Sequence, residues 1–159
     1  MKPIPARCLI LACGNTLREE DGVGPWLATW AEERFAGEGC VRVLSRQQWA
    51  PELAEDVVYA ESVIFIDCAA NARPGSLHLV PVAPRVDPER IATHHFDASE
   101  LLSLTQEMFG ATPRVSLLLT IGAGSLELRE GLSAAVQSAI PEACRMLERA
   151  VISLLKESA

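Results

Sequence analysis

The stretch Cys8-Leu9-Ile10-Leu11-Ala12-Cys13, followed directly by Gly14, decides the fold. It is apolar at every position and only six residues long, which is typical of a strand buried on both faces of a parallel sheet. After Gly22, apolar residues recur at intervals of three and four, as they do along one face of a helix: Val23, Trp26, Leu27, Trp30 and Ala31. The chain is therefore expected to begin with strand, loop and helix.

Further strands and helices alternate along the rest of the chain. We expect strands at residues 41–44, 63–66, 76–82 and 115–121, and helices at residues 51–59, after Asp97 and from about residue 133. Pro81 indicates an edge strand, antiparallel because no helix precedes it. Asp97 and Glu100 have the spacing of a capping box, and Pro141 should bend or divide the last helix.

This pattern predicts the α/β fold class. We expect a single three-layer α/β/α domain over residues 1–159, with about five strands in a mostly parallel, twisted sheet and one antiparallel edge strand. A chain of this length can bury roughly 68–70% of the surface that it exposes when unfolded. We find no linker that would mark a second domain.

Composition narrows the possible partners. The formal net charge is −7, which would repel the phosphates of nucleic acids and acidic membrane surfaces, so neither is an expected partner. The five cysteines are an odd number and form no Cys-x-x-Cys pair, which fits a reducing cytoplasm better than a disulfide framework. We recognise neither a signal peptide nor a membrane-spanning segment.

Three side chains are candidates for a metal site: Asp21 in the loop after the first strand, Asp67 at the end of the third, and His94 before a helix. Two carboxylates and one imidazole leave coordination positions open, as a catalytic or sensing site requires. These donors suit nickel, zinc and similar divalent ions, and they do not decide between them. Open α/β sheets place functional groups at the carboxyl ends of their strands, where Asp67 is expected.

Other interpretations of the first loop have to be weighed. A dinucleotide-binding loop needs a third glycine where Leu27 stands, no Gly-Lys-Ser/Thr follows Gly14, and Glu19, Glu20 and Asp21 would repel a pyrophosphate. Asp21 can also simply cap the following helix, which would stabilise it by about 0.5–2 kcal/mol. One acid would suffice for a cap, and three adjacent acids exceed that need.

A thiol nucleophile is a second alternative. Cys13 and Cys68 adjoin the candidate site, and His94 could act as the base. Side chains alternate along a strand, so Cys68 should point away from Asp67. Free buried cysteine is usually an apolar filler, and we expect no catalytic role for either thiol.

Five blocks of the sequence resemble one protein family. The first runs from Gly14 to Gly24, with Asn15, Leu17, Glu20, Asp21 and Gly22 at matching positions. The others are Pro51-Glu52-Leu53-Ala54, the strand that ends in Asp67, and the segments 93–102 and 130–133. In this order they resemble the hydrogenase maturation proteases, endopeptidases that trim the C-terminus of the large subunit of nickel-iron hydrogenases. The departures are Ala12 for a usual glycine and His95-Phe96-Asp97 for Gly-Leu-Ser, which leaves His94 as the better match of the two histidines.

The resemblance implies a function and its residues. It implies that Asp21, Asp67 and His94 bind metal, that Asp21 or Asp67 serves as a catalytic base, and that the substrate is a nickel-iron hydrogenase large-subunit precursor. It further implies nickel, presented by the substrate, with zinc or another divalent ion as a possible substitute. Gln47, Gln48 and Trp49 are expected to contact the substrate. A non-catalytic metal-sensing or chaperone module, and a small-molecule hydrolase or nucleotide binder, are the alternative functions.

Overall fold

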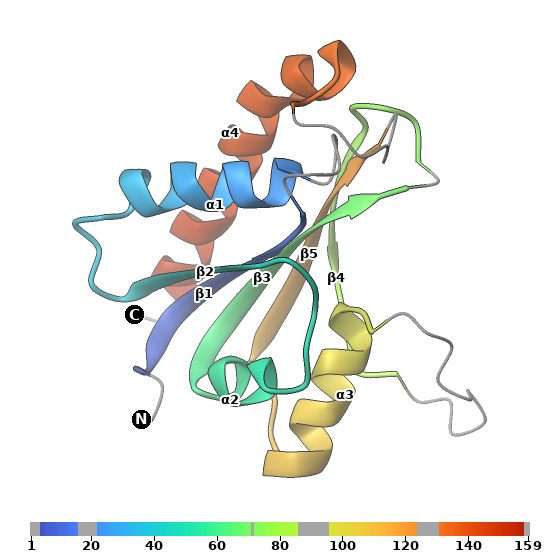
Figure 1. Cartoon of the computed structure of the whole chain (residues 1–159). Coiled ribbons are helices and arrows are strands. Elements are labelled where there is room, and N and C mark those ends of the chain that lie inside the picture. Colours follow the sequence, from blue (N-terminus) through green and yellow to red (C-terminus); the bar gives the residue numbers. More distant parts are fainter. Residues whose placement is uncertain (1–3, 16–21, 71, 86–95, 124–130, 158–159) are drawn as a thin grey trace.

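The computed structural model describes residues 4–15, 22–70, 72–85, 96–123 and 131–157. Within these residues, strands and helices alternate along the chain as expected (Figure 1). Their order is β1 (Ala6–Cys13), α1 (Val23–Arg34), β2 (Val41–Arg46), α2 (Leu53–Val58), β3 (Ala60–Ala69), β4 (Leu77–Pro81), α3 (Ala98–Phe109), β5 (Val115–Gly122) and α4 (Ala134–Glu157).

The predicted α/β class is confirmed. The described strands form one sheet in the order β2-β1-β3-β5-β4. Strands β1, β2, β3 and β5 run parallel, while β4 pairs with β5 antiparallel and contains Pro81, as the sequence predicted. Proline is tolerated there because an edge strand has one side without ladder hydrogen bonds.

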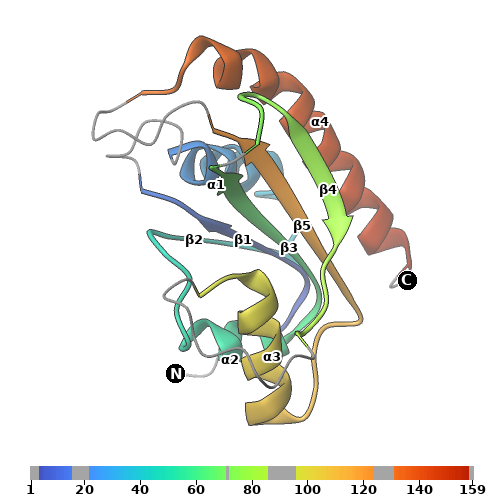
Figure 2. The same ribbon diagram turned by 90° about the vertical axis from the view of Figure 1, so that its right-hand side faces the viewer.

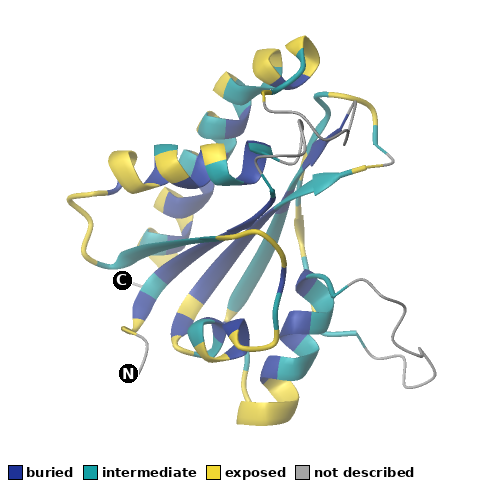
Figure 3. Cartoon of the chain, in the orientation of Figure 1, coloured by how far each residue is buried: buried dark blue, intermediate teal, exposed yellow. Residues whose placement is uncertain are grey.

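Helices cover both faces of this sheet, so the structure has three layers (Figure 2). Side chains of β1 and β3 alternate between the two faces: Ile10 and Ile64 pack with α1 and α4, whereas Leu11 and Phe65 pack with α2 and α3. Buried residues concentrate in the central strands, and the helices expose their outer sides (Figure 3). A strand segment buried on both faces has to be apolar, which explains the uninterrupted apolar run from Cys8 to Cys13 in β1.

The structure refines three local expectations. Strand β3 does not end at Asp67 but continues to Ala69, because Cys68 and Ala69 still pair with Ile121 and Gly122 of β5. Helix α4 continues through Pro141, so the proline does not divide it. The cap of α3 is as predicted: the Asp97 side chain accepts a hydrogen bond from the Glu100 N–H at 2.9 Å.

None of the described helices combines the length and the apolar character that a bilayer-spanning helix needs.

One close backbone contact positions the first helix. Gly24 lies in the first turn of α1, and a Cβ atom at this residue would lie 2.4 Å from the Cys13 carbonyl oxygen at the end of β1. Any larger residue would have to push the helix away from the strand. Gly24 thus lets the beginning of α1 rest on the carboxyl end of β1.

We predict that Gly24→Ala lowers the free energy of unfolding by about 1–3 kcal/mol, because the added methyl group overpacks the contact with Cys13. Urea unfolding would measure this loss. Gly37→Ala is the matched control, since no atom lies within 4 Å of an added Cβ there, and it should change the free energy by less than about 0.5 kcal/mol. Equal effects of the two substitutions would contradict this account of the contact.

Candidate functional site

The order of the strands defines a site at the carboxyl ends of the central parallel strands. From β1 the chain proceeds to β2 on one side, while β3 and then β5 lie on the other side. Ligands of open α/β sheets bind at such a switch point, outside the carboxyl ends of the strands. Cys13 ends β1 there and is followed by Gly14, and Asp67 lies two residues before the end of β3.

Asp67 is the predicted site residue that the structure describes. It is half-buried, and it lies on the same face of β3 as Val63 and Phe65, toward α2 and α3. Among the described residues, two N–H groups donate hydrogen bonds to its carboxylate. The Trp49 indole N–H donates to Oδ2 at 3.0 Å, and the Cys68 backbone N–H donates to Oδ1 at 2.8 Å.

The three residues expected to contact the substrate differ in their surroundings. Gln47 and Gln48 are exposed in the segment after β2, as a docking role requires. Trp49 is only 8% exposed, and its ring stands edge-on to Phe65 with 5.5 Å between the ring centroids. The expectation that Trp49 offers a docking surface is therefore wrong in this structure, because packing and the bond to Asp67 hold the indole inside. A buried indole needs an acceptor for its N–H, and the Asp67 carboxylate supplies it here.

Asp21 and His94, the other two predicted ligands, lie outside the described residues. Among those residues, no three His, Cys, Asp or Glu side chains form a group able to hold a metal ion. The predicted cluster therefore stays a prediction.

Two described residues close to Asp21 in the sequence, Gly14 and Gly22, lie near the carboxyl end of β1. The Gly14 N–H donates to the Arg46 carbonyl at 3.0 Å, which joins the start of the glycine-containing loop to the end of β2. Gly22 is the N-cap residue of α1, and it has no side chain with which to cap the helix. Asp21 is therefore not the N-cap residue of α1, and its predicted capping role stays a prediction.

The chain on the two sides of the segment 86–95, which contains His94, is linked by polar contacts. The Arg85 guanidinium pairs with the Asp97 carboxylate, and the Arg85 N–H donates to Ser103 Oγ at 2.7 Å. Ser103 lies on α3, whose N-cap is Asp97. The chain therefore enters and leaves the segment 86–95, which contains His94, at the same helix.

Two of the cysteines, Cys8 and Cys144, are poorly suited to act as nucleophiles. The Cys8 side chain is fully buried, and burial raises the pKa of its thiol to about 12. Burial also raises the pKa of Cys144 on α4. A thiol with a raised pKa is protonated at neutral pH and is a poor nucleophile. Cys68 follows Asp67 in the strand, so alternation directs its side chain to the opposite face of the sheet.

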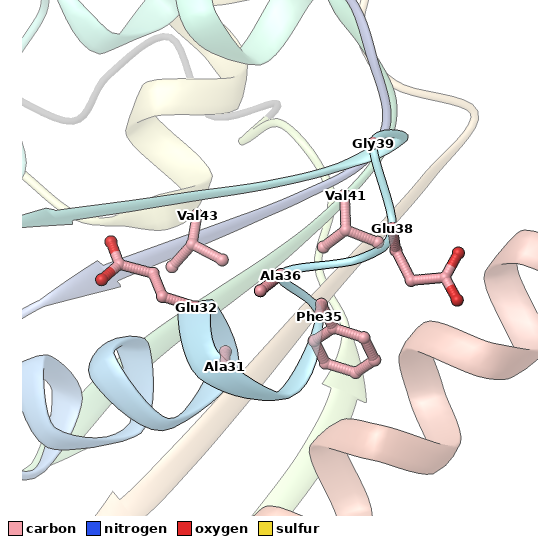
Figure 4. A pocket seen from close by; sticks show the side chains of 8 residues that line it. All are labelled: Ala31, Glu32, Phe35, Ala36, Glu38, Gly39, Val41 and Val43. Carbon is pink, nitrogen blue, oxygen red and sulfur yellow. The ribbon is translucent and has the colours of Figure 1, made fainter.

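A hollow elsewhere on the molecule is separate from Asp67. It lies between the C-terminal end of α1 and the N-terminal part of β2, where it is lined by apolar side chains that include Phe35, Val41 and Val43 (Figure 4). The carboxylates of Glu32 and Glu38 lie on its two sides, pointing away from each other. This is the end of the sheet opposite to the carboxyl ends of the strands, so the hollow is not part of the switch-point site.

Comparisons with known proteins agree with one another. The model of the family described as hydrogenase maturation protease matches residues 31–150. The hydrogenase 2 maturation protease of Escherichia coli is 26% identical over 156 residues, which cover 96% of this chain and 92% of that protein. The solved hydrogenase maturating endopeptidase HybD of E. coli has a TM-score of 0.73 at 23% identity, covering 96% of this chain and 94% of that chain. A [NiFe] hydrogenase maturation protease of Thermococcus kodakarensis gives a TM-score of 0.70 at 21% identity, with 95% and 93% covered.

The two solved structures named above, which share this fold, are hydrogenase maturation proteases, and this chain also has a carboxylate at the switch point. The family model matches well over half of this chain. The chain belongs to the hydrogenase maturation protease family, and it is an endopeptidase that processes a hydrogenase. The matched region includes Asp67 and His94, whereas Asp21 precedes it.

We predict that the buried Cys8 thiol makes stability depend on alkaline pH. Its pKa is about 12 in the folded chain, against an ordinary value of 9.0, so the unfolded chain releases this proton first as the pH rises. Its contribution to stability is complete below about pH 9 and is lost progressively as the pH approaches about 12. Wild type should therefore lose more unfolding free energy than Cys8→Ala between about pH 8 and pH 10. Urea unfolding at both pH values would show this, and equal losses would contradict it.

Proposed function

We propose that this protein removes the C-terminal extension of a nickel-iron hydrogenase large-subunit precursor after nickel has been inserted. In this proposal Asp21, Asp67 and His94 bind the nickel that the precursor presents. The protease then acts as a check on its substrate, because only a loaded precursor completes the site. The chain's membership in the family supports the general activity, and the residue assignments are our inference.

One observation carries the assignment of Asp67. Its carboxylate lies at the switch point of the sheet and accepts hydrogen bonds from two fixed N–H donors, one from a buried side chain and one from the backbone. Carboxylates that bind metals are typically held by such additional hydrogen bonds.

The chemistry follows from these residues. Oxygen and imidazole donors suit nickel, and zinc or another divalent ion would fit the same set. A bound divalent ion can polarise the scissile carbonyl or lower the pKa of a water molecule. Asp67 and Asp21 each have the chemistry to accept a proton from the attacking water, so either can be the general base. The exposed amides of Gln47 and Gln48 can hydrogen-bond to the peptide of the precursor.

A non-catalytic metal-sensing or chaperone module with the same fold is the second candidate function. It would use the same three residues without cleavage, so fold alone does not separate it from a protease. The family match favours the protease.

The nickel requirement can be tested with purified components. A large-subunit precursor, prepared with and without nickel, is incubated with the protein, and its mass is followed. We expect loss of the C-terminal peptide from the loaded precursor only. Intact loaded precursor would support the chaperone function, and cleavage of both forms would contradict nickel recognition.

Substitution of the three ligands tests the site itself. We predict that Asp67→Asn, Asp21→Asn and His94→Ala each reduce cleavage of the loaded precursor at least about a hundredfold, as loss of a metal ligand or base does in other enzymes. Circular dichroism should show that each variant remains folded. Glu61→Gln is the matched control, because Glu61 is an exposed acid in the same strand as Asp67 but at its other end. A variant that cleaves at the wild-type rate would remove that residue from the site.

A further inference from the structure

Trp49 connects the hydrophobic core to the candidate site. Its side chain belongs to the core cluster that also contains Leu53, Phe65 and Leu101, between the sheet and helices α2 and α3. The ring is 8% exposed and meets Phe65 at an interplanar angle of 82°. Phe65 precedes Asp67 by two residues in β3, so the two side chains share a face of the strand.

The geometry of the hydrogen bond fixes one oxygen of the carboxylate. The indole N–H is a donor only, and it donates to Asp67 Oδ2 at 3.0 Å. The ring cannot rotate away without leaving its contacts with the core, so the position of this donor is set by packing. The Cys68 N–H donates to the other oxygen, Oδ1, at 2.8 Å. Two donors on different oxygens define the plane of the carboxylate.

We propose that Trp49 is a positioning residue for Asp67, holding the carboxylate in the orientation that receives the metal. This inference rests on the proposed function, since it assumes that Asp67 is a ligand. Trp49 itself contacts neither the metal nor the peptide in this account. Its effect is on the entropy of binding. A carboxylate that hydrogen bonds already hold in place loses little conformational freedom when it binds the metal.

The variant Trp49→Phe separates this role from packing. Phenylalanine keeps an aromatic ring against Phe65 and removes the N–H donor. Trp30→Phe is the matched control, because Trp30 also stands edge-on to a phenylalanine, Phe35, with 6.3 Å between ring centroids, but on the face of the sheet covered by α1 and α4. Both variants lose one indole, and only Trp49→Phe loses the bond to Asp67.

The first measurement uses Ni²⁺ alone and the loaded precursor. Relative to wild type, Trp49→Phe should bind Ni²⁺ about tenfold to a hundredfold more weakly in calorimetry, with a matching decrease in the rate of precursor cleavage. Trp30→Phe should retain both. Wild-type values for Trp49→Phe, or equal losses in the two variants, would overturn the proposal. Wild type that neither binds Ni²⁺ nor depends on it would instead refute the proposed function.

The second measurement tests the hydrogen bond without relying on activity or metal. The three tryptophans give three indole N–H signals in a ¹⁵N-labelled sample, and Trp49→Phe assigns one of them. In the Asp67→Ala variant this signal should shift and exchange with solvent faster, while the signals of Trp26 and Trp30 remain in place. An unchanged Trp49 signal would overturn the proposal even if the protein proves to be a nickel-dependent protease.

Discussion

The parallel pairing of β1 with β3 is the constraint on which the rest of the structure depends. Both strands are buried on both faces, and each buried face needs a helix layer to cover it. The chain supplies α1 and α4 for one face and α2 and α3 for the other. After β1 the chain continues to β2 on one side of this pair, and β5 and β4, which follow β3 in the chain, lie on the other side. No connection therefore crosses over the carboxyl ends of β1 and β3. The site is therefore a consequence of how the core is buried.

Core packing also controls the side chain at that site. Trp49 comes from the segment after β2, yet its ring is part of the core and its N–H reaches the carboxylate of Asp67 on β3. Gly24 has a similar function on the other face, where its lack of a side chain lets α1 approach the end of β1. Residues packed in the core thus determine where the elements around the site lie. Substitutions in the core should affect chemistry as well as stability.

Much of this arrangement could be predicted from the sequence, because it depends on local patterns. The apolar runs of β1 and β3 identify buried parallel strands, Pro81 identifies the edge strand, and Asp97 identifies the start of α3. The end of β3 could not be predicted, since it is set by pairing with β5, which is far away in the sequence. The burial of Trp49 was missed for the same reason: its partners, Phe65 and Asp67, are not its neighbours in the chain. In the sequence, a residue that follows Gln47 and Gln48 and precedes Ala50 and Pro51 looks like part of a surface loop.

The central claim is that Asp21, Asp67 and His94 converge on one metal ion at the carboxyl edge of the sheet. Crystals of the protein soaked in Ni²⁺, with diffraction data collected at the nickel absorption edge, test this most directly. We predict an anomalous peak within coordination distance of an oxygen of Asp67, an oxygen of Asp21 and a ring nitrogen of His94, which for the same donors on zinc is about 2.0–2.2 Å. A nickel ion bound by other residues would contradict the account, and so would three side chains that lie too far apart to bind the same ion.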